Sequence, residues 1–109
     1  MNVENTKAQM RKGVLEYCIL GVLAQGECYP SDIIAKLKEA KLIVVEGTLY
    51  PLLTRLKDAG LLDYRWEESR SGPPRKYYRI TLLGNKFLDE LDESWQELAQ
   101  AVKKTTKRN

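Results

Sequence analysis

The chain of 109 residues is 43% hydrophobic and 30% charged, which suits a single folded domain with a modest core. Its formal net charge of +3 does not by itself indicate a nucleic-acid partner, so the placement of the charges matters more. Two cysteines without any histidine exclude an ordinary structural zinc site and a disulfide scaffold, and we expect no metal and no cofactor. The longest apolar run, residues 18–24, is too short to cross a bilayer, and no signal-peptide pattern opens the chain, so we expect a cytoplasmic protein without a membrane partner.

Two helices are predicted before residue 40. The segment Thr6-Lys7-Ala8-Gln9 fits a capping box, so a first helix is expected from near Lys7 to Gly26. Pro30 opens the second helix because proline is accepted in a first turn. Residues 42–45 form an apolar run in which three of the four side chains are β-branched, which predicts an extended connector or a one-bridge strand. The first helix has one face that is expected to be buried, with Cys18 as a buried thiol: Leu15, Cys18, Ile19, Val22 and Leu23. A second apolar side needs another partner, and it consists of Met10, Val14 and Tyr17.

A third helix is predicted over residues 47–59, ended by Gly60. Its start is open, because either Thr48 caps it or it begins at Glu46. The opposite side of this helix is polar. The apolar side forms a core stripe to which we assign no function: Leu49, Leu52, Leu53 and Leu56.

A β-hairpin and a long helix complete the chain. Alternating residues 62–67 predict a half-buried strand, residues 69–74 the tip, and residues 75–81 the returning strand. Thr81 is the expected cap of a helix that runs from about Leu82 into the tail. Apolar residues of this helix follow the 3-4 spacing of a short coiled-coil seam, which predicts a dimer interface: Leu88, Leu91, Trp95, Leu98 and Val102.

Helix-helix-helix-strand-strand is the order of a winged helix-turn-helix, so the fold class is mainly α with a small β-hairpin and a C-terminal dimerisation helix. We expect residues 1–81 to form the DNA-binding part and residues 82–109 the dimerisation helix with a basic tail, in one compact unit. A helix of this kind fits the major groove, and a basic hairpin reaches nearby phosphates. The alternative is that the 47–59 helix is a core helix with a solvated face. The expected DNA contacts are Thr48, Tyr50, Pro51, Thr54, Arg55, Lys57, Gly72, Arg75 and Lys76.

Charge is divided along the chain. Residues 70–79 carry Arg70, Arg75, Lys76 and Arg79 with no acid, and residues 89–97 carry five acids with no base. This division suggests that one face meets a polyanion and another does not. The basic tail at 103–108 fits either a contact with DNA or a solvated end. The sequence lacks the residues that common enzyme classes need, since it has no histidine, no glycine-rich phosphate loop and no nucleophile beside a base. We therefore expect that the chain is not an enzyme.

Trp95 is bulky for a two-helix seam. It is either a dimer-core aromatic or, where the paired helices leave a gap, a stacking surface for a flat hydrophobic ligand. Acidic neighbours would favour a cationic ligand. The residues expected around such a pocket are Val14, Leu91, Asp92, Trp95 and Leu98.

Two segments resemble the PadR family of bacterial transcriptional regulators. The first is Glu46-Gly47-Thr48-Leu49-Tyr50-Pro51 together with Leu53, Arg55, Leu56 and Gly60-Leu61-Leu62. The second is residues 72–81 together with Gly84. The resemblance covers most of the chain and implies a homodimeric winged-helix repressor that releases a two-fold symmetric DNA operator on binding a small effector. The short chain with a single C-terminal helix resembles the compact branch of the family. Some members of that branch sense planar drugs through an aromatic on the last helix, and Glu93-Ser94-Trp95 is similar to that segment. The alternative function is a winged-helix protein-interaction module that does not bind DNA.

Two positions depart from the family pattern. Val45 stands where a Ser or Asn cap is usual before Glu46. The tip reads Ser71-Gly72-Pro73-Pro74-Arg75-Lys76 and lacks the usual arginine, for which Arg70 is the candidate substitute. We therefore expect Arg75 and Lys76 to bind phosphate rather than bases.

Overall fold

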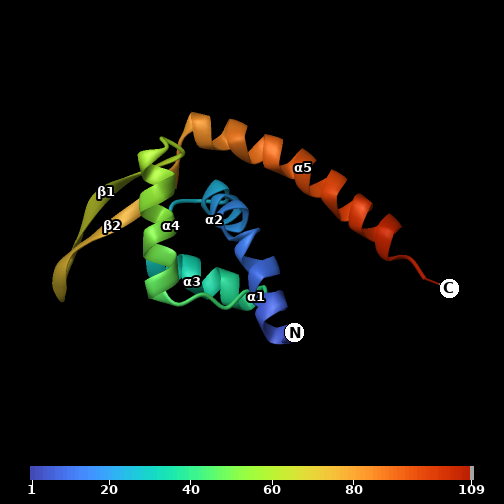
Figure 1. Ribbon diagram of the computed structural model, residues 1–109. Helices are drawn as coiled ribbons and strands as arrows, with labels where there is room; N and C mark the ends of the chain where they lie inside the picture. Colours follow the sequence, from blue (N-terminus) through green and yellow to red (C-terminus); the bar gives the residue numbers. More distant parts are fainter. Residues whose placement is uncertain (109) are drawn as a thin grey trace.

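The computed structural model describes residues 1–108, which form a helical body with a hairpin at one end and a long helical arm at the other (Figure 1). Its longest dimension is 59 Å, against 31 and 22 Å for the others, because the arm extends away from the body. The elements of the described residues are α1 (Val3–Lys12), α2 (Leu15–Ala24), α3 (Pro30–Glu39), α4 (Glu46–Asp58), β1 (Leu62–Ser69), β2 (Gly72–Ile80) and α5 (Leu82–Thr106). This architecture confirms the mainly helical class with a small hairpin.

The N-terminal region forms two helices, so the prediction of one helix from Lys7 to Gly26 was wrong. The cap is Asn2, whose Oδ1 accepts hydrogen bonds from two backbone N–H groups of the first turn, and Thr6 instead donates its hydroxyl to the Asn2 carbonyl. The break falls at Gly13 and Val14, where the Val14 N–H donates to Arg11 O over a tighter turn. Glycine weakens a helix interior, and here it separates the exposed α1 from the buried α2.

The helix α4 begins at Glu46, after an extended Val45 that makes no side-chain cap hydrogen bond, so a cap at Thr48 is excluded. Residues 42–45 form a connector without strand pairing, so of the two predicted forms the extended connector is confirmed and the one-bridge strand is not. At its other end α4 closes on Gly60, whose φ of 80° lies in the left-handed region that favours glycine. The start and stop of the predicted 47–59 helix are thus confirmed to within a residue.

The hairpin turn is narrower than expected, because the strands pair as far as Ser69 and Gly72 and only Arg70 and Ser71 lie between them. Pro73 and Pro74 belong to β2, which corrects their placement in the tip. They are accommodated by a register irregularity between Glu67 and Ser69, where the ladder does not require their missing N–H groups. The hairpin of β1 and β2, which we call the wing, is therefore paired almost to its end.

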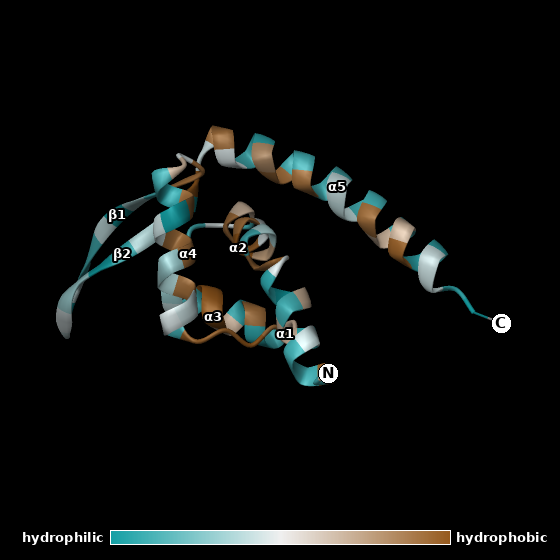
Figure 2. Ribbon diagram, viewed as in Figure 1, coloured by the Kyte–Doolittle hydropathy of each residue, from teal (hydrophilic) through white to brown (hydrophobic). Residues whose placement is uncertain are grey.

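The core lies between α2, α3, α4 and the base of the hairpin. Figure 2 shows an apolar stripe on the side of α5 that faces the body. The β2 strand is tied to the α2–α3 loop by a bridge in which Cys28 and Tyr78 exchange hydrogen bonds of 2.8 and 3.0 Å. Burial raises the pKa of the Cys28 thiol and of the half-buried Cys18 thiol, so both remain protonated, and both are free.

The root of α5 is held against the end of α4 by a set of hydrogen bonds. Thr81 donates its hydroxyl to Gly60 O at 2.7 Å and accepts from the Gly84 N–H at 3.0 Å, which confirms Thr81 as the cap. Its own N–H donates to Leu61 O at 3.1 Å. The direction of α5 is thereby fixed relative to α4. Of the helices in residues 1–108, none is both long and apolar enough to cross a membrane.

Candidate nucleic-acid interface

The exposed surface of α4 has three sides, which meet different parts of the molecule. Opposite the buried Leu49, Leu53 and Leu56, a helical repeat of 3.6 residues places Pro51 and Thr54, and both are exposed. The predicted DNA contacts on this central side therefore face solvent without a covering element. A second side turns toward the hairpin and a third toward α1 and α2.

The hairpin side of α4 carries Tyr50 and Lys57. Tyr50 is 44% exposed and lines a hollow of about 430 Å³ with Tyr29, Trp66 and the wing cations. The Lys57 ammonium lies 5.6 Å from the centre of the Tyr64 ring, at the limit of a cation–π contact. These two residues therefore extend the surface of α4 onto the wing.

The third side of α4 separates Thr48 and Arg55 from the other predicted contacts. Thr48 lines a shallow hollow of about 220 Å³ with residues of α1 and the 42–45 connector. The Arg55 Nε lies 3.5 Å from a carboxylate oxygen of Glu16 on α2, with Arg55 75% exposed and Glu16 31% exposed. Such an exposed pair is weak, worth about 0–1 kcal/mol, so Arg55 is held only loosely away from the central side.

The wing presents two cations that stack on aromatic rings. The Arg75 guanidinium lies 3.9 Å from the centre of the Tyr29 ring, and the Lys76 ammonium lies 4.5 Å from the Tyr64 ring and 5.6 Å from the Trp66 ring. Neither cation has a carboxylate within ion-pair distance among residues 1–108. Stacking orders the two side chains without neutralising them, which leaves their charge for an anionic partner.

Two other cations of the hairpin, Arg79 and Arg65, are already paired, which the sequence did not indicate. Arg79 is bonded to Asp63, its direct partner across the strands, although the run 70–79 itself contains no acid. Arg65 on β1 is bonded to Glu67 and lies 3.4 Å from Glu27. Gly72 sits beside the turn that contains Arg70. Arg70, Arg75 and Lys76 are the cations of the 70–79 run that no ion pair engages among residues 1–108.

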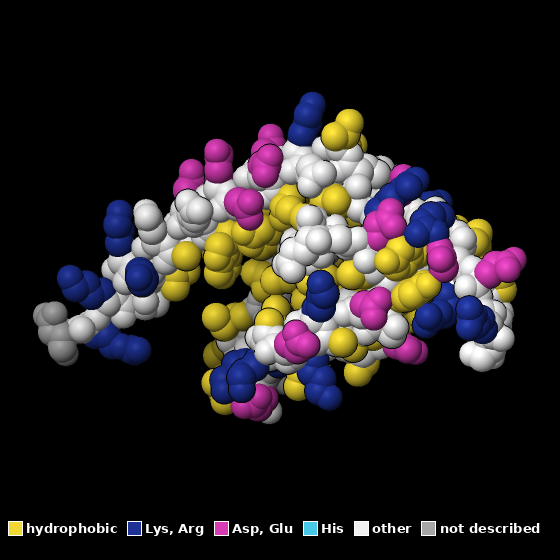
Figure 3. Space-filling view, turned by 180° about the vertical axis from the view of Figure 1, so that it is seen from behind, with side chains coloured by type: hydrophobic (Ala, Val, Ile, Leu, Met, Phe, Trp, Pro, Cys, Tyr) yellow, Lys and Arg dark blue, Asp and Glu magenta, His cyan; other side chains and the backbone are white. Residues whose placement is uncertain are grey.

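The inner face of α5 and the outer face of α1 border an apolar groove, which we call the Trp95 groove. Its cavity of about 650 Å³ is lined by Met10, Val14, Trp95, Leu98 and Val102 together with Gln9, Arg11, Gly13, Ala99 and Lys103. Figure 3 shows hydrophobic side chains beneath the arm of α5 and acidic ones along its outer side. Trp95, Leu98 and Val102 are each about half exposed, whereas Leu88 and Leu91 of the predicted seam pack partly on the core of their own chain.

Two residues expected in the pocket, Leu91 and Asp92, are not among those that line the Trp95 groove. Asp92 is bonded elsewhere. Its Oδ1 accepts a hydrogen bond of 2.5 Å from the Tyr17 hydroxyl, which joins α5 to α2. The hydrogen bond to this carboxylate, with burial and its negative charge, raises the pKa of Tyr17 to about 12. Met10, which the sequence analysis put on the second apolar side of the first helix, lines the groove.

Comparison with known proteins gives the family. Residues 19–90 match the PadR-like family of transcriptional regulators. A PadR-like transcription factor from Bacteroides fragilis is 62% identical over 94% of this chain and 99% of its own, with a TM-score of 0.79. A PadR family regulator from Eggerthella lenta is 33% identical over 98% of this chain and 94% of its own, with a TM-score of 0.86.

A solved complex of Bacillus subtilis PadR with operator DNA is also similar. It is 31% identical over 72% of this chain and 46% of that longer chain, with a TM-score of 0.67. The family match confirms the prediction that the chain is not an enzyme. The near-complete coverage and the shared winged-helix fold lead to one conclusion: the chain belongs to the PadR-like family of transcriptional regulators.

Proposed function

We propose that the chain is a homodimeric transcriptional repressor that reads DNA with α4 and holds phosphates with the wing. The observation that carries this proposal is the pair of ordered, uncompensated cations, Arg75 and Lys76, beside the exposed side of α4. Phosphate contacts of this kind supply affinity, while a helix in the major groove supplies specificity. The likeness to a PadR that was solved on its operator supports the same arrangement.

In this proposal the three sides of α4 have different roles. Thr54 and Pro51 approach base edges from the central side, and Tyr50 and Lys57 contact the backbone together with the wing. Arg55 reaches a base or a phosphate after it leaves Glu16, at the small cost of an exposed ion pair. Thr48, on the α1 side, approaches the neighbouring phosphate, and Gly72 lets the wing backbone come close to DNA because no side chain projects there.

DNA binding is tested on the region upstream of the chain's own gene, because regulators of this class often act there. We expect a gel shift and a footprint with two-fold symmetry, with half-sites about one helical turn apart or a multiple of it. In the variant Arg55→Ala, discrimination between cognate and random DNA should fall by roughly 1–3 kcal/mol if Arg55 contacts guanine. The native protein, measured at two salt concentrations, is the reference for this variant. Absence of any symmetric protection would favour the protein-interaction module instead.

The dimer is proposed to form through α5 with help from α1. Trp95, Leu98 and Val102 are 45, 56 and 48% exposed in one chain, and Met10 of α1 is 69% exposed. Such a row of large apolar side chains is typical of a subunit interface. Leu98→Asp would place a charge in it and cost several kcal/mol of association. Sedimentation of a native monomer at micromolar concentration would contradict the dimer.

The effector is proposed to be a planar hydrophobic molecule, cationic by preference, that stacks on Trp95 in the groove. The volume of about 650 Å³ lies within the range of ligand pockets, and Trp95 already has Tyr17 as an aromatic neighbour at 6.5 Å between ring centres. Binding there would shift the two reading helices and lower DNA affinity by the coupling energy. Titration with planar cationic dyes, followed by tryptophan quenching, tests this with Trp95→Ala as control, because Trp66 also emits. Equal dye affinity in that variant would exclude the proposed stacking.

A further inference from the structure

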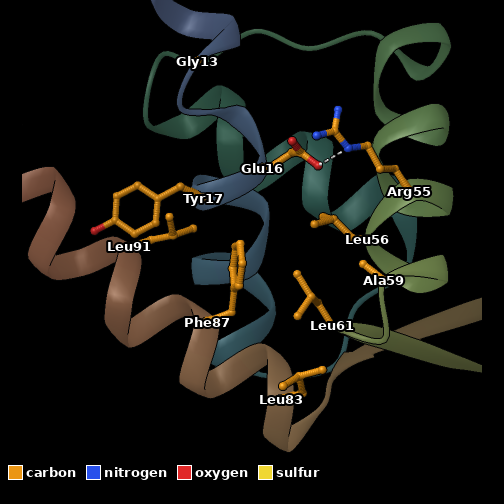
Figure 4. Close-up of a pocket in the computed structure, with 10 residues that line it drawn as sticks. All are labelled: Gly13, Glu16, Tyr17, Arg55, Leu56, Ala59, Leu61, Leu83, Phe87 and Leu91. Carbon is orange, nitrogen blue, oxygen red and sulfur yellow. Dashed lines mark ion pairs between the residues drawn. The ribbon is translucent and has the colours of Figure 1, made fainter.

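A second cavity lies behind α4, apart from the Trp95 groove. It has a volume of about 460 Å³ and sits where α2, the C-terminal half of α4 and the first turns of α5 meet (Figure 4). We call it the α4–α5 cavity. Its apolar lining comes mainly from α4, the following loop and α5: Leu56, Ala59, Leu61, Leu83, Phe87 and Leu91.

The polar groups of the α4–α5 cavity are few and converge on one side. Figure 4 shows Glu16 and Arg55 paired at the edge of the cavity, opposite the side chains of α5. Tyr17 is the third polar group, and its hydroxyl hydrogen is already donated to Asp92. An apolar cavity of this size with a small number of convergent polar groups has the make-up of a small-molecule site.

The hydrogen bonds still free in the cavity decide the chemistry of its ligand. The Arg55 Nε lies 3.5 Å from a carboxylate oxygen of Glu16. No side-chain hydrogen bond and no other ion pair engages Arg55 in residues 1–108, so the N–H donors of the two terminal nitrogens can serve a ligand. The Tyr17 hydroxyl has only acceptor capacity left. The free donors therefore belong to a cation, and they match an anion, best a carboxylate that meets the planar guanidinium with two oxygens.

We propose that the α4–α5 cavity binds a small molecule with an apolar body and one carboxylate, which Arg55 holds in place of Glu16. The body would lie among Leu61, Leu83 and Phe87, of which Leu83 is 55% and Phe87 41% exposed and would lose water on binding. This site differs from the Trp95 groove in position and in preferred charge. Its occupation would turn Arg55 toward α5 and away from DNA, a consequence that rests on the proposed function.

The test measures binding without DNA, so that it does not depend on the proposed function. Octanoate, below its micellar concentration, and octan-1-ol serve as a carboxylate and a neutral probe of equal length. Their binding to the native protein is followed through backbone amide shifts in nitrogen-15 NMR spectra. We expect octanoate to shift the amides of Leu61, Leu83 and Phe87 and to bind about twofold to fivefold more tightly than octanol, the modest preference that an exposed arginine supplies.

Four variants examine the two parts of the site. Arg55→Met should abolish the preference for the carboxylate, and Glu16→Gln should increase it, because the competing anion is removed. Ala59→Phe should fill the cavity and weaken both probes. Ala40→Phe is its matched control, since Ala40 and Ala59 occupy the same capping position at the ends of α3 and α4 and only Ala59 lines the cavity.

Several results would overturn the inference. These are equal affinities for both probes in native protein and in Arg55→Met, shifts confined to residues of the Trp95 groove, or no shifts at millimolar octanoate. The native and Arg55→Met arms decide the matter even if Ala59→Phe fails to fold. A gel shift then addresses DNA release separately. Octanoate should lower the affinity of the native protein for DNA, whereas a native protein that binds no DNA even without octanoate would refute the proposed function and leave the NMR result in force.

Discussion

Gly84 is the position where a single methyl group should most disturb this fold. It is the only buried residue of α5, and a Cβ built there would overlap the Leu61 carbonyl oxygen and lie 2.7 Å from Ile80 Cγ1. Real Cβ atoms essentially never approach a neighbour closer than 3.0 Å, and a backbone carbonyl is not free to turn away. Gly84→Ala must therefore move the root of α5 away from the end of α4.

The cost of Gly84→Ala can be estimated from two opposing terms. Overpacking a tight site costs about 1–3 kcal/mol, and more when backbone must shift. Alanine in a helix gains about 0.5–1 kcal/mol over glycine, which offsets part of it. Gly21→Ala in α2 is the matched control, because a Cβ there has nothing within 4 Å and keeps only the gain.

Urea unfolding followed by circular dichroism measures both variants. We expect Gly84→Ala to lower the free energy of unfolding by about 1–3 kcal/mol and Gly21→Ala to leave it unchanged or raise it. At a total of roughly 5–15 kcal/mol for a small domain, the folded state should survive either change. If Gly84→Ala unfolds at the same urea concentration as Gly21→Ala, the contact with the Leu61 carbonyl is not what holds α5.

Three further outcomes are expected. In Tyr17→Phe the hydrogen bond to α5 is lost, and because the folded pKa of about 12 lies above the ordinary 10, the advantage of the native protein should persist below pH 10 and disappear as the pH rises toward 12 in unfolding measurements. Lys41→Gly, at a φ of 66°, should raise the free energy of unfolding by up to about 1 kcal/mol, whereas Gly60→Ala, at a φ of 80°, should lower it by about that amount. Thermal unfolding measures both, and changes of the same sign and size would contradict the strain argument. Joint replacement of Arg75 and Lys76 by alanine should weaken all DNA sequences alike and reduce the salt slope by about one to two, and a loss on the operator alone would refute a phosphate role.

Local signals predicted most of the elements. The leucine spacing and Gly60 gave α4, the alternation of residues 62–67 gave β1, and Thr81 gave the start of α5. Each of these signals depends on a few neighbouring residues, so the element can be predicted without knowledge of tertiary contacts. The break at Gly13 escaped because one glycine costs a helix only about 1 kcal/mol, and tertiary packing decides whether the helix continues.

The contacts of the candidate site depend on residues far apart in the chain, and these were not predictable. Arg55 and Glu16 are brought together only when α4 packs beside α2. Arg79 meets Asp63 because of the register that follows the narrow turn, and that register also depends on how two prolines are accommodated. The charge run 70–79 thus looked uniformly free in sequence, although the fold leaves only part of it unpaired.

The close contact of Gly84 with the Leu61 carbonyl relates the stability of the monomer to the proposed reading of DNA. Helix α5 has 25 residues and a length of about 37 Å, so a tilt of about 10° at its root moves its far end by about 6 Å. In a dimer formed through α5, this movement would change the separation of the two α4 helices, while half-sites on DNA stay near 34–36 Å apart. Gly84→Ala should then lose affinity for the symmetric operator more than for random DNA, since phosphate contacts by each wing tolerate the shift. Competition binding measures the ratio of the two affinities, and an unchanged ratio in a folded, dimeric Gly84→Ala protein would mean that the spacing of the reading helices is set elsewhere.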